Sequence, residues 1–383
     1  GVTVNQGTGQ PGNDAASLWI RGLGSYNYGD YAIFIDGFQV PFSFFQYLLP
    51  SELESISVLK DAAALAPLGM KGANGALWVT TKRGAPGKPR IQLQARTGFQ
   101  QPTHLTKPLG SYDYARLYNE AVSNDAGMQW NPVYGDAELE SFRTGTGTNT
   151  DWYGEVLKNS TPFSTADVTL NGGNETARYF VMLGYLKDQG LYRVGNDDTH
   201  ANAGLQQFNA RTRLDFDLYD IFEGNVSVSG RTEDRSHPNY DSEALWNNMA
   251  QYPALIYPAQ NEDGTWPGLN VYPDNPLASI RELGYVSTHD RTLQASLSLK
   301  ERLDFILPGL YLGQAASFNT WTRGSYNITK NYARVINGQT QTTDQNTNYE
   351  VFDDQGTNQW NWIQFQVQAG YERQWGLHVL TKA

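Results

Sequence analysis

The chain contains 383 residues, has a formal net charge of −11 at pH 7 and lacks cysteine. The acidic balance argues against a nucleic-acid-binding protein, because such proteins usually carry a basic surface, and the lack of cysteine excludes disulfides and thiolate metal sites. Only 39% of the residues are hydrophobic, whereas glycine and aromatic residues are plentiful, a composition that favours a β protein with alternating polar and apolar residues.

Residues 1–85 are predicted to form a compact α/β domain. Short apolar runs bounded by glycines indicate strands, and acidic residues after Pro50 indicate a helical turn, since negative charge is favourable at the start of a helix. Asp61 is a suitable N-cap for the alanine-rich helix that follows it. A linker rich in glycine and proline comes next, at 84–89. The expected strands are 17–21, 32–35, 55–60 and 76–82, and the expected helical turns are 51–54 and 61–66.

From Arg90 onward, polar and apolar residues alternate with a period of two, which is typical of strands with two different faces. The clearest segment is 208–218, in which apolar residues alternate with Arg211, Arg213 and Asp215. Such a polar face suits either the wet lumen of a barrel or the solvated side of an ordinary sheet. The expected strands are centred on 91–95, 166–170, 179–185, 208–218, 226–228, 293–299, 310–321 and 363–371, and a ninth begins at 378–382.

Short and long connections alternate between these strands. Four connections are tight, and four are long, near 97–164, 189–206, 232–289 and 326–357. Bacterial outer-membrane barrels have short periplasmic turns and long extracellular loops, so this alternation favours a barrel over a soluble β-sandwich. No stretch approaches the length of about 18 apolar residues that a membrane-spanning helix requires, and the first ten residues do not resemble a signal peptide.

Four motifs in the first domain carry a family resemblance. Their order and spacing are similar to the plug-domain signatures of SusC/RagA-type TonB-dependent outer-membrane transporters, and weaker similarity continues through 110–120, 150–153 and 171–179. One departure is that Ala66–Gly75 lacks the tyrosine and arginine usual in that family. The four motifs are LWIRGLGS (18–25), IFIDG (33–37), LESISVLKDA (53–62) and GANGALWVTTKRG (72–84).

The resemblance implies a β-dominated fold. It comprises a small α/β plug domain (1–85) followed by antiparallel strands of a transmembrane β-barrel (86–383). A plugged transporter barrel has about 22 strands, and an open sheet edge is costly in lipid. We therefore expect an incomplete barrel of eight or nine strands that belongs to a longer protein. The TonB-contacting segment would precede Gly1, and the missing strands would follow Ala383.

No residue pattern indicates catalysis or a cofactor, and the chain is not expected to be an enzyme. The five histidines are scattered, and none is paired at a spacing typical of metal ligands. Asn196–Thr199 and Asp353–Gly356 offer oxygen ligands of the kind that Ca²⁺ binds in loops, although neither has the EF-hand spacing. No metal site is predicted, and Ca²⁺ binding in these two segments is only the alternative interpretation.

Two groups of residues are candidates for function within the resemblance. Aromatic residues in the plug loops could contact a substrate or, as the competing interpretation, pack the plug against the barrel wall; the candidates are Tyr26, Tyr28, Phe42 and Phe44. Charged residues in the plug motifs could hold the plug by ion pairs to the wall; these are Arg21, Asp36, Lys60, Asp61 and Arg83, with Arg211 and Asp215 as wall partners. Trp321, Tyr326, Trp360, Trp362 and Trp375 are predicted to form an interfacial girdle.

The function implied by the resemblance is active import of a large nutrient, an oligosaccharide or a peptide, across the outer membrane of a diderm bacterium. Import would be energised by the TonB–ExbB–ExbD complex, and a SusD-like surface lipoprotein would cover the long loops, with 232–289 as a candidate contact. One alternative is a non-transporting surface or assembly protein on the same barrel. A soluble carbohydrate-binding β domain is the other.

Overall fold

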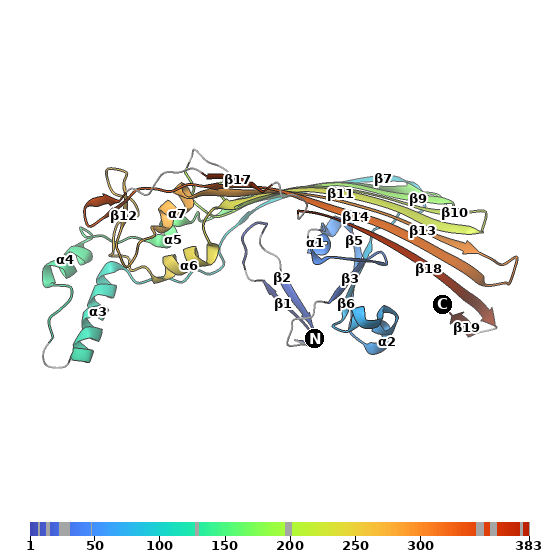
Figure 1. Cartoon of the computed structure of the whole chain (residues 1–383), viewed down its shortest axis with the longest axis horizontal. Helices are drawn as coiled ribbons and strands as arrows, with labels where there is room; N and C mark the ends of the chain where they lie inside the picture. Colours follow the sequence, from blue (N-terminus) through green and yellow to red (C-terminus); the bar gives the residue numbers. More distant parts are fainter. Residues whose placement is uncertain are drawn as a thin grey trace.

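A computed structural model describes residues 1–6, 8–12, 16–22, 31–46, 48–126, 130–195, 201–341, 348–352, 358–375 and 378–382. The chain forms a small N-terminal domain that lies against the concave side of a large curved sheet (Figure 1). Helices gather at one end of this sheet, and tight turns lie at the other. Within the described residues, no helix is long and apolar enough to cross a membrane.

The N-terminal domain is built around a mixed sheet in the order β4-β3-β6-β5. Its central strand β3 is buried along its whole length, because every side chain in it is apolar. A separate antiparallel hairpin, β1–β2, stands beside this sheet. The elements are β1 (Val2–Gln6), β2 (Ala16–Ile20), β3 (Ala32–Ile35), β4 (Phe38–Val40), α1 (Phe42–Gln46), η1 (Pro50–Glu52), β5 (Leu53–Leu59), α2 (Ala62–Leu65), η2 (Ala66–Gly72) and β6 (Ala76–Thr81). The strands and helical turns expected from the sequence are all present, whereas β1, β4, α1 and η2 were not predicted.

The large sheet is antiparallel, and neighbouring long strands follow chain order. The expected eight strands and the start of a ninth are present, so the predicted fold class is confirmed. Their alternation of tight turns with long connections also follows the predicted pattern. The strands are β7 (Gly87–Gln100), β8 (Thr161–Gly173), β9 (Ala177–Gln189), β10 (Gly204–Leu218), β11 (Phe222–Pro238), β13 (Gly284–Arg302), β14 (Leu310–Thr329), β18 (Gln359–Trp375) and β19 (His378–Lys382), and β17 (Asn348–Phe352) also pairs with β14.

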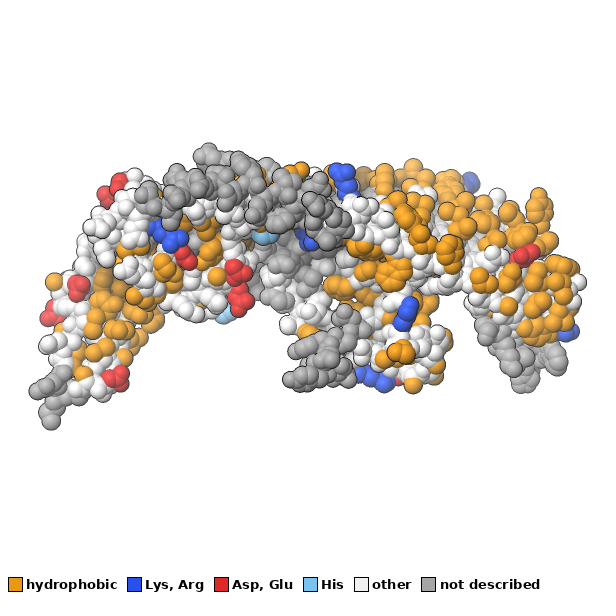
Figure 2. Space-filling view, viewed as in Figure 1, with side chains coloured by type: hydrophobic (Ala, Val, Ile, Leu, Met, Phe, Trp, Pro, Cys, Tyr) orange, Lys and Arg blue, Asp and Glu red, His pale blue; other side chains and the backbone are white. Residues whose placement is uncertain are grey.

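On the large sheet, polar side chains are buried and apolar side chains are exposed, which is the opposite of a soluble protein. On β10, Arg211 and Arg213 are buried, whereas Phe208 and Leu214 are exposed. Other exposed apolar side chains are Ile91, Leu93, Leu183, Leu293, Leu297, Ile363, Phe365 and Val367. Figure 2 shows hydrophobic side chains gathered over the end of the sheet away from the helices. A contiguous apolar surface of this kind suits contact with lipid and argues against the soluble alternative.

The long connections at the other end pack together into one structure, here called the loop module. Trp152, Tyr332 and the pair Leu245 and Ile280 come from three different connections and share one hydrophobic core. The loops are therefore held by a core of their own rather than by the barrel strands alone. The module contains α3 (Ser111–Ala126), α4 (Asp136–Thr144), α5 (Trp152–Val156), α6 (Ser242–Gln251), α7 (Pro276–Glu282), β12 (Trp266–Gly268), β15 (Arg334–Ile336) and β16 (Gln339–Gln341).

Candidate functional site between the N-terminal domain and the large sheet

The first contact between the two parts is a buried ion pair at the end of η1. The Nε atom of Arg211 donates to Glu52 Oε2 at 2.7 Å, and Asn209 Nδ2 donates to the other oxygen at 2.8 Å. The backbone N–H of Leu49 also donates to this carboxylate, so the short turn itself orients it. The side chains of Arg211 and Glu52 are 4% and 3% exposed. Each charge is therefore almost fully removed from water and depends on the other.

The second contact centres on Arg213, which lies between two carboxylates. Its Nη1 atom is 3.3 Å from Asp36 Oδ2, while its Nε and Nη2 atoms donate to Asp215 on the same strand. Asp36 adopts a left-handed backbone conformation, with φ of 49°, in the turn between β3 and β4, a conformation that aspartate tolerates better than most residues. Thr81 holds the Asp36 carboxylate through its N–H and its hydroxyl. The turn thus presents a fixed acid to the sheet.

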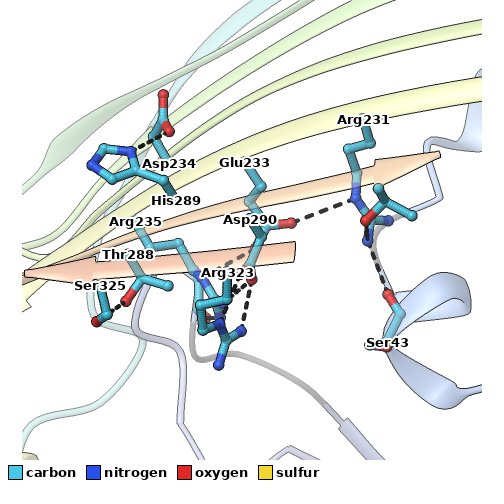
Figure 3. Close-up of polar contacts among 12 residues, drawn as sticks. Ser43, Arg231, Glu233, Asp234, Arg235, Thr288, His289, Asp290, Arg323 and Ser325 are labelled. Carbon is cyan, nitrogen blue, oxygen red and sulfur yellow. Dashed lines mark hydrogen bonds and ion pairs between the residues drawn. The ribbon is translucent and has the colours of Figure 1, made fainter. Parts of the chain in front are cut away.

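The third contact is a cluster of charged residues nearer the loop module (Figure 3). Arg231 Nη2 donates to the carbonyl of Ser43 in α1 at 3.1 Å, and Arg235 Nη1 donates to the carbonyl of Gly12 at 3.0 Å. Asp290 accepts from Arg235 and, through both oxygens, from Arg323. Glu233 is buried between Arg231 and Arg235. At this end the sheet donates hydrogen bonds, and the N-terminal domain accepts them through uncharged oxygens.

Aromatic packing and amide contacts complete the interface. Phe44 of α1 is 2% exposed, and its ring centroid lies 5.2 Å from that of Trp360 on β18. Leu49 fits against Gly184, where a Cβ atom would approach its Cδ1 atom to 2.5 Å. The Gln364 side chain also donates to the carbonyl of Gln39 at 2.6 Å.

Much of this interface is polar, and this polarity determines how firmly the N-terminal domain is held against the sheet. A buried pair of charges is strongly destabilised when one partner is removed, yet the pair as a whole adds little stability over apolar packing. A surface of this kind can favour one docked position and still allow the two parts to dissociate. Among the residues that the structure describes, no cluster of histidine and acidic side chains could hold a metal ion.

Comparisons with known proteins agree on one family. Residues 1–76 match the TonB-dependent receptor plug domain family. The chain is 27% identical over 289 residues to TonB-dependent receptor P26 of Formosa agariphila and 26% identical over 307 residues to TonB-dependent receptor SusC of Bacteroides thetaiotaomicron, each match covering 73% of this chain. Structures of the RagAB peptide importer in its open-open and closed-closed states share the fold, with TM-scores of 0.73 and 0.71, over all of this chain and 43% of theirs, at 18% identity.

Together, these matches support a TonB-dependent transporter of the SusC/RagA type. The N-terminal domain, which matches the plug family, is called the plug below, and the large sheet is called the wall. The matched regions span only 26% of the Formosa receptor and 28% of SusC.

Several of the predicted plug charges lie elsewhere than at the wall. Arg21 and Asp61 pair with each other at 2.7 Å on the exposed surface of the plug. Lys60 and Arg83 are exposed, and no described residue forms an ion pair with either of them, although Arg83 lines a cavity together with Arg178 and Asp215 of the wall. Asp36 does lie against the wall, where Arg213 lies between it and Asp215. Whether these residues gate the pore stays a prediction.

The sequence did not reveal Glu52, the residue that binds Arg211. Glu52 and Glu54 stand in the same short acidic segment, and no local signal distinguishes the buried one from the exposed one. The carbonyls of Gly12 and Ser43 were also missed, because any residue supplies a backbone oxygen. Only the docked arrangement of plug and wall selects these groups.

The aromatic predictions need two corrections. Phe44 is buried against Trp360, so it packs the plug on the wall and offers no free ring to a substrate. Trp321 and Trp360 are not girdle residues, because they face inward and pack against the plug core. Phe42 is half-buried and stays a candidate for substrate contact. Tyr26, Tyr28 and both candidate Ca²⁺ segments (196–199 and 353–356) lie outside the described residues.

Proposed function

We propose that this chain is the plug and part of the barrel of an importer that moves a large nutrient across the outer membrane of a diderm bacterium. The observation that carries the proposal is the buried, charged interface between plug and wall, centred on Glu52, Arg211, Asp36 and Arg213. Permanent interfaces are usually more apolar than interfaces that separate. Charged groups regain hydration when they part, so this surface suits a plug that is withdrawn and then docks again.

The energy source and partners follow from the family. The TonB–ExbB–ExbD complex would pull the plug, and a SusD-like lipoprotein would cover the loop module. The connection between β11 and β13 is the candidate contact for this lid, and its helix α6 exposes Trp246. The cargo would be an oligosaccharide or a peptide; the similar RagAB assembly is a peptide importer. No bond chemistry is assigned to this chain.

The test is energised uptake by the full-length transporter in its native membrane. Cells that carry or lack the gene are given labelled peptides and labelled oligosaccharides, with and without a protonophore. We expect uptake of one class, lost on gene deletion and on collapse of the proton gradient, while surface binding survives the protonophore. Binding without gradient-dependent uptake would instead support the alternative of a non-transporting surface protein.

A further inference from the structure

The β1–β2 hairpin of the plug contacts both the wall and the loop module through its tip. All five residues of β1 are exposed, and a hairpin of two strands is only marginally stable by itself in water. Among the described residues of its tip, two make contacts: Arg235 Nη1 on the wall donates to Gly12 O at 3.0 Å, and Ser242 Oγ of the loop module donates to Gln10 Oε1 at 2.9 Å. The tip therefore joins the plug to the wall and to the loop module at one place.

A cavity of about 480 Å³ adjoins the tip. It lies between β11, the start of α6 and the plug segment, and its polar lining includes Gln10, Arg235, Ser242, Thr288 and Arg323. Gly12 is needed here for two reasons. Its φ is +74°, and a Cβ atom would lie 2.6 Å from Arg235 Cδ. The arginine stem thus packs directly on the plug backbone.

The direction of the hydrogen bonds indicates which ligand fits. In both tip contacts, the wall or the loop module donates and a plug oxygen accepts. The nearby described acids are engaged: Asp290 accepts from Arg235 and Arg323, and the buried Glu233 pairs with Arg235 at 3.1 Å. Asp241, which also lines the cavity, caps α6 by accepting from the Ala244 N–H at 2.7 Å. The start of α6 adds a partial positive charge beside the cavity.

A carboxylate presents two oxygens to such donors. Its bonds to guanidinium groups are charge-assisted and about twice as strong as bonds to uncharged oxygens. It would therefore compete effectively with the carbonyl of Gly12 and the side-chain amide of Gln10, which now accept from Arg235 and Ser242.

We propose that this cavity binds a carboxylate group of the cargo, which replaces the oxygens of Gly12 and Gln10 and so detaches the hairpin tip. This inference depends on the proposed import function in one respect, namely that the ligand is the transported cargo. A ligand that binds one of two conformations better shifts the equilibrium by its differential affinity. Couplings of this kind are typically 5–150-fold, so we expect a rise in the detached population on the order of tenfold.

Spin labelling tests the proposal in the full-length transporter. This chain has no cysteine, so Val4→Cys on the exposed β1 gives a nitroxide site whose mobility reports attachment of the hairpin. The probes are two matched pairs: trialanine with trialanine amide, and glucuronate with glucose. We expect the carboxylate member of at least one pair to mobilise the label and its neutral partner to leave it unchanged. The responding pair tells whether the carboxylate comes from a peptide or from an acidic sugar.

Variants keep the test decisive. Arg235→Gln should abolish the carboxylate response. Because Arg235 also hydrogen-bonds to Asp290, a second variant is needed. Ser242→Ala should mobilise the label without ligand and weaken the response. Ser296→Ala, on the wall away from the cavity, is the matched control and should behave like the parent protein. Equal responses to carboxylate and neutral probes, or no response to either, would overturn the proposal.

Failure of this site and failure of the import proposal are separable. Gradient-dependent uptake together with an unresponsive label would overturn the carboxylate site alone. A carboxylate-specific response in a protein without energised uptake would support the site and overturn import.

Discussion

Loss of Arg211 tests the plug–wall interface most directly. The Arg211→Gln variant leaves the Glu52 carboxylate buried with only Asn209 and the Leu49 N–H as donors. Removing one partner of a buried ion pair typically costs about 3–5 kcal/mol. The two side chains are 4% and 3% exposed and 2.7 Å apart, so the cost should not be reduced by solvent. Each 1.4 kcal/mol is a factor of ten, and docking of the plug should weaken by a factor of roughly 10² to 4 × 10³.

The consequence can be measured as leak through the full-length transporter in planar bilayers. We expect Arg211→Gln to raise the frequency of open events strongly. The double variant Glu52→Gln/Arg211→Gln should recover much of the loss, because no uncompensated charge remains in it. Arg178 and Asp217 form a matched control pair, since they lie on neighbouring strands at the same distance of 2.7 Å but are 28% and 38% exposed.

Two results would refute the reasoning. Arg178→Gln removes a more exposed pair worth about 0–1 kcal/mol and should leave the leak unchanged; an effect equal to that of Arg211→Gln would show that burial is irrelevant. A double variant as leaky as the sum of the two single variants would show that Glu52 and Arg211 are not coupled.

Three further predictions concern packing, the lipid face and the loop module. Phe44→Ala should destabilise plug docking by about 3–5 kcal/mol, seen as faster proteolysis of the plug, whereas Phe365→Ala, at a wall position 79% exposed, should leave plug proteolysis unchanged. Leu297→Arg on the apolar face should cost about 2–4 kcal/mol at mid-bilayer depth in urea unfolding from liposomes, and an unchanged midpoint would contradict a lipid-facing role. Burial, aided by the nearby Asp274 carboxylate, raises the pKa of Tyr240 to about 12. Its neutral form is thus favoured in the folded loop module, so this contribution to stability is complete below pH about 10 and lost as pH rises through about 12. The difference between the absorbance titrations of the parent protein and of Tyr240→Phe isolates Tyr240, and a difference that titrates near pH 10 in the folded protein would contradict this prediction.

Local patterns in the sequence were enough to predict the nine long strands of the wall and three of the four strands of the plug sheet. Strand alternation depends on a period of two residues, and the lengths of connections follow from where that period stops. The plug motifs likewise combine glycines, short apolar runs and a turn aspartate within a few residues of each other. Within the N-terminal domain, the elements that escaped prediction have weak local signals: β1 is fully exposed, β4 is three residues long, the aromatic run in α1 resembles an apolar loop, and η2 contains a proline and a non-helical Gly69. The helices and short strands of the loop module also escaped, because their segments were predicted only as long connections.

The contacts that make up the candidate site could not be predicted in the same way. Glu52 and Arg211 are 159 residues apart in the chain, and Gly12 and Arg235 are 223 apart. The sequence contains many acidic and basic residues in similar local contexts, and no rule of spacing predicts which of them form ion pairs. Arg21 and Asp61 illustrate this, since both stand in plug motifs and yet pair with each other on the surface.

By itself, the sequence determined the family, the order of strands and the two faces of the wall, because these depend on short-range pattern and on motif content. Only the tertiary structure decided that Glu52 rather than Lys60 holds the plug, that Trp321 and Trp360 face inward, and that Arg235 binds the hairpin tip. The physical reason is that burial selects among chemically similar groups. A charge or a ring acquires its role when the plug docks and removes it from water, and that event depends on residues far away in the chain.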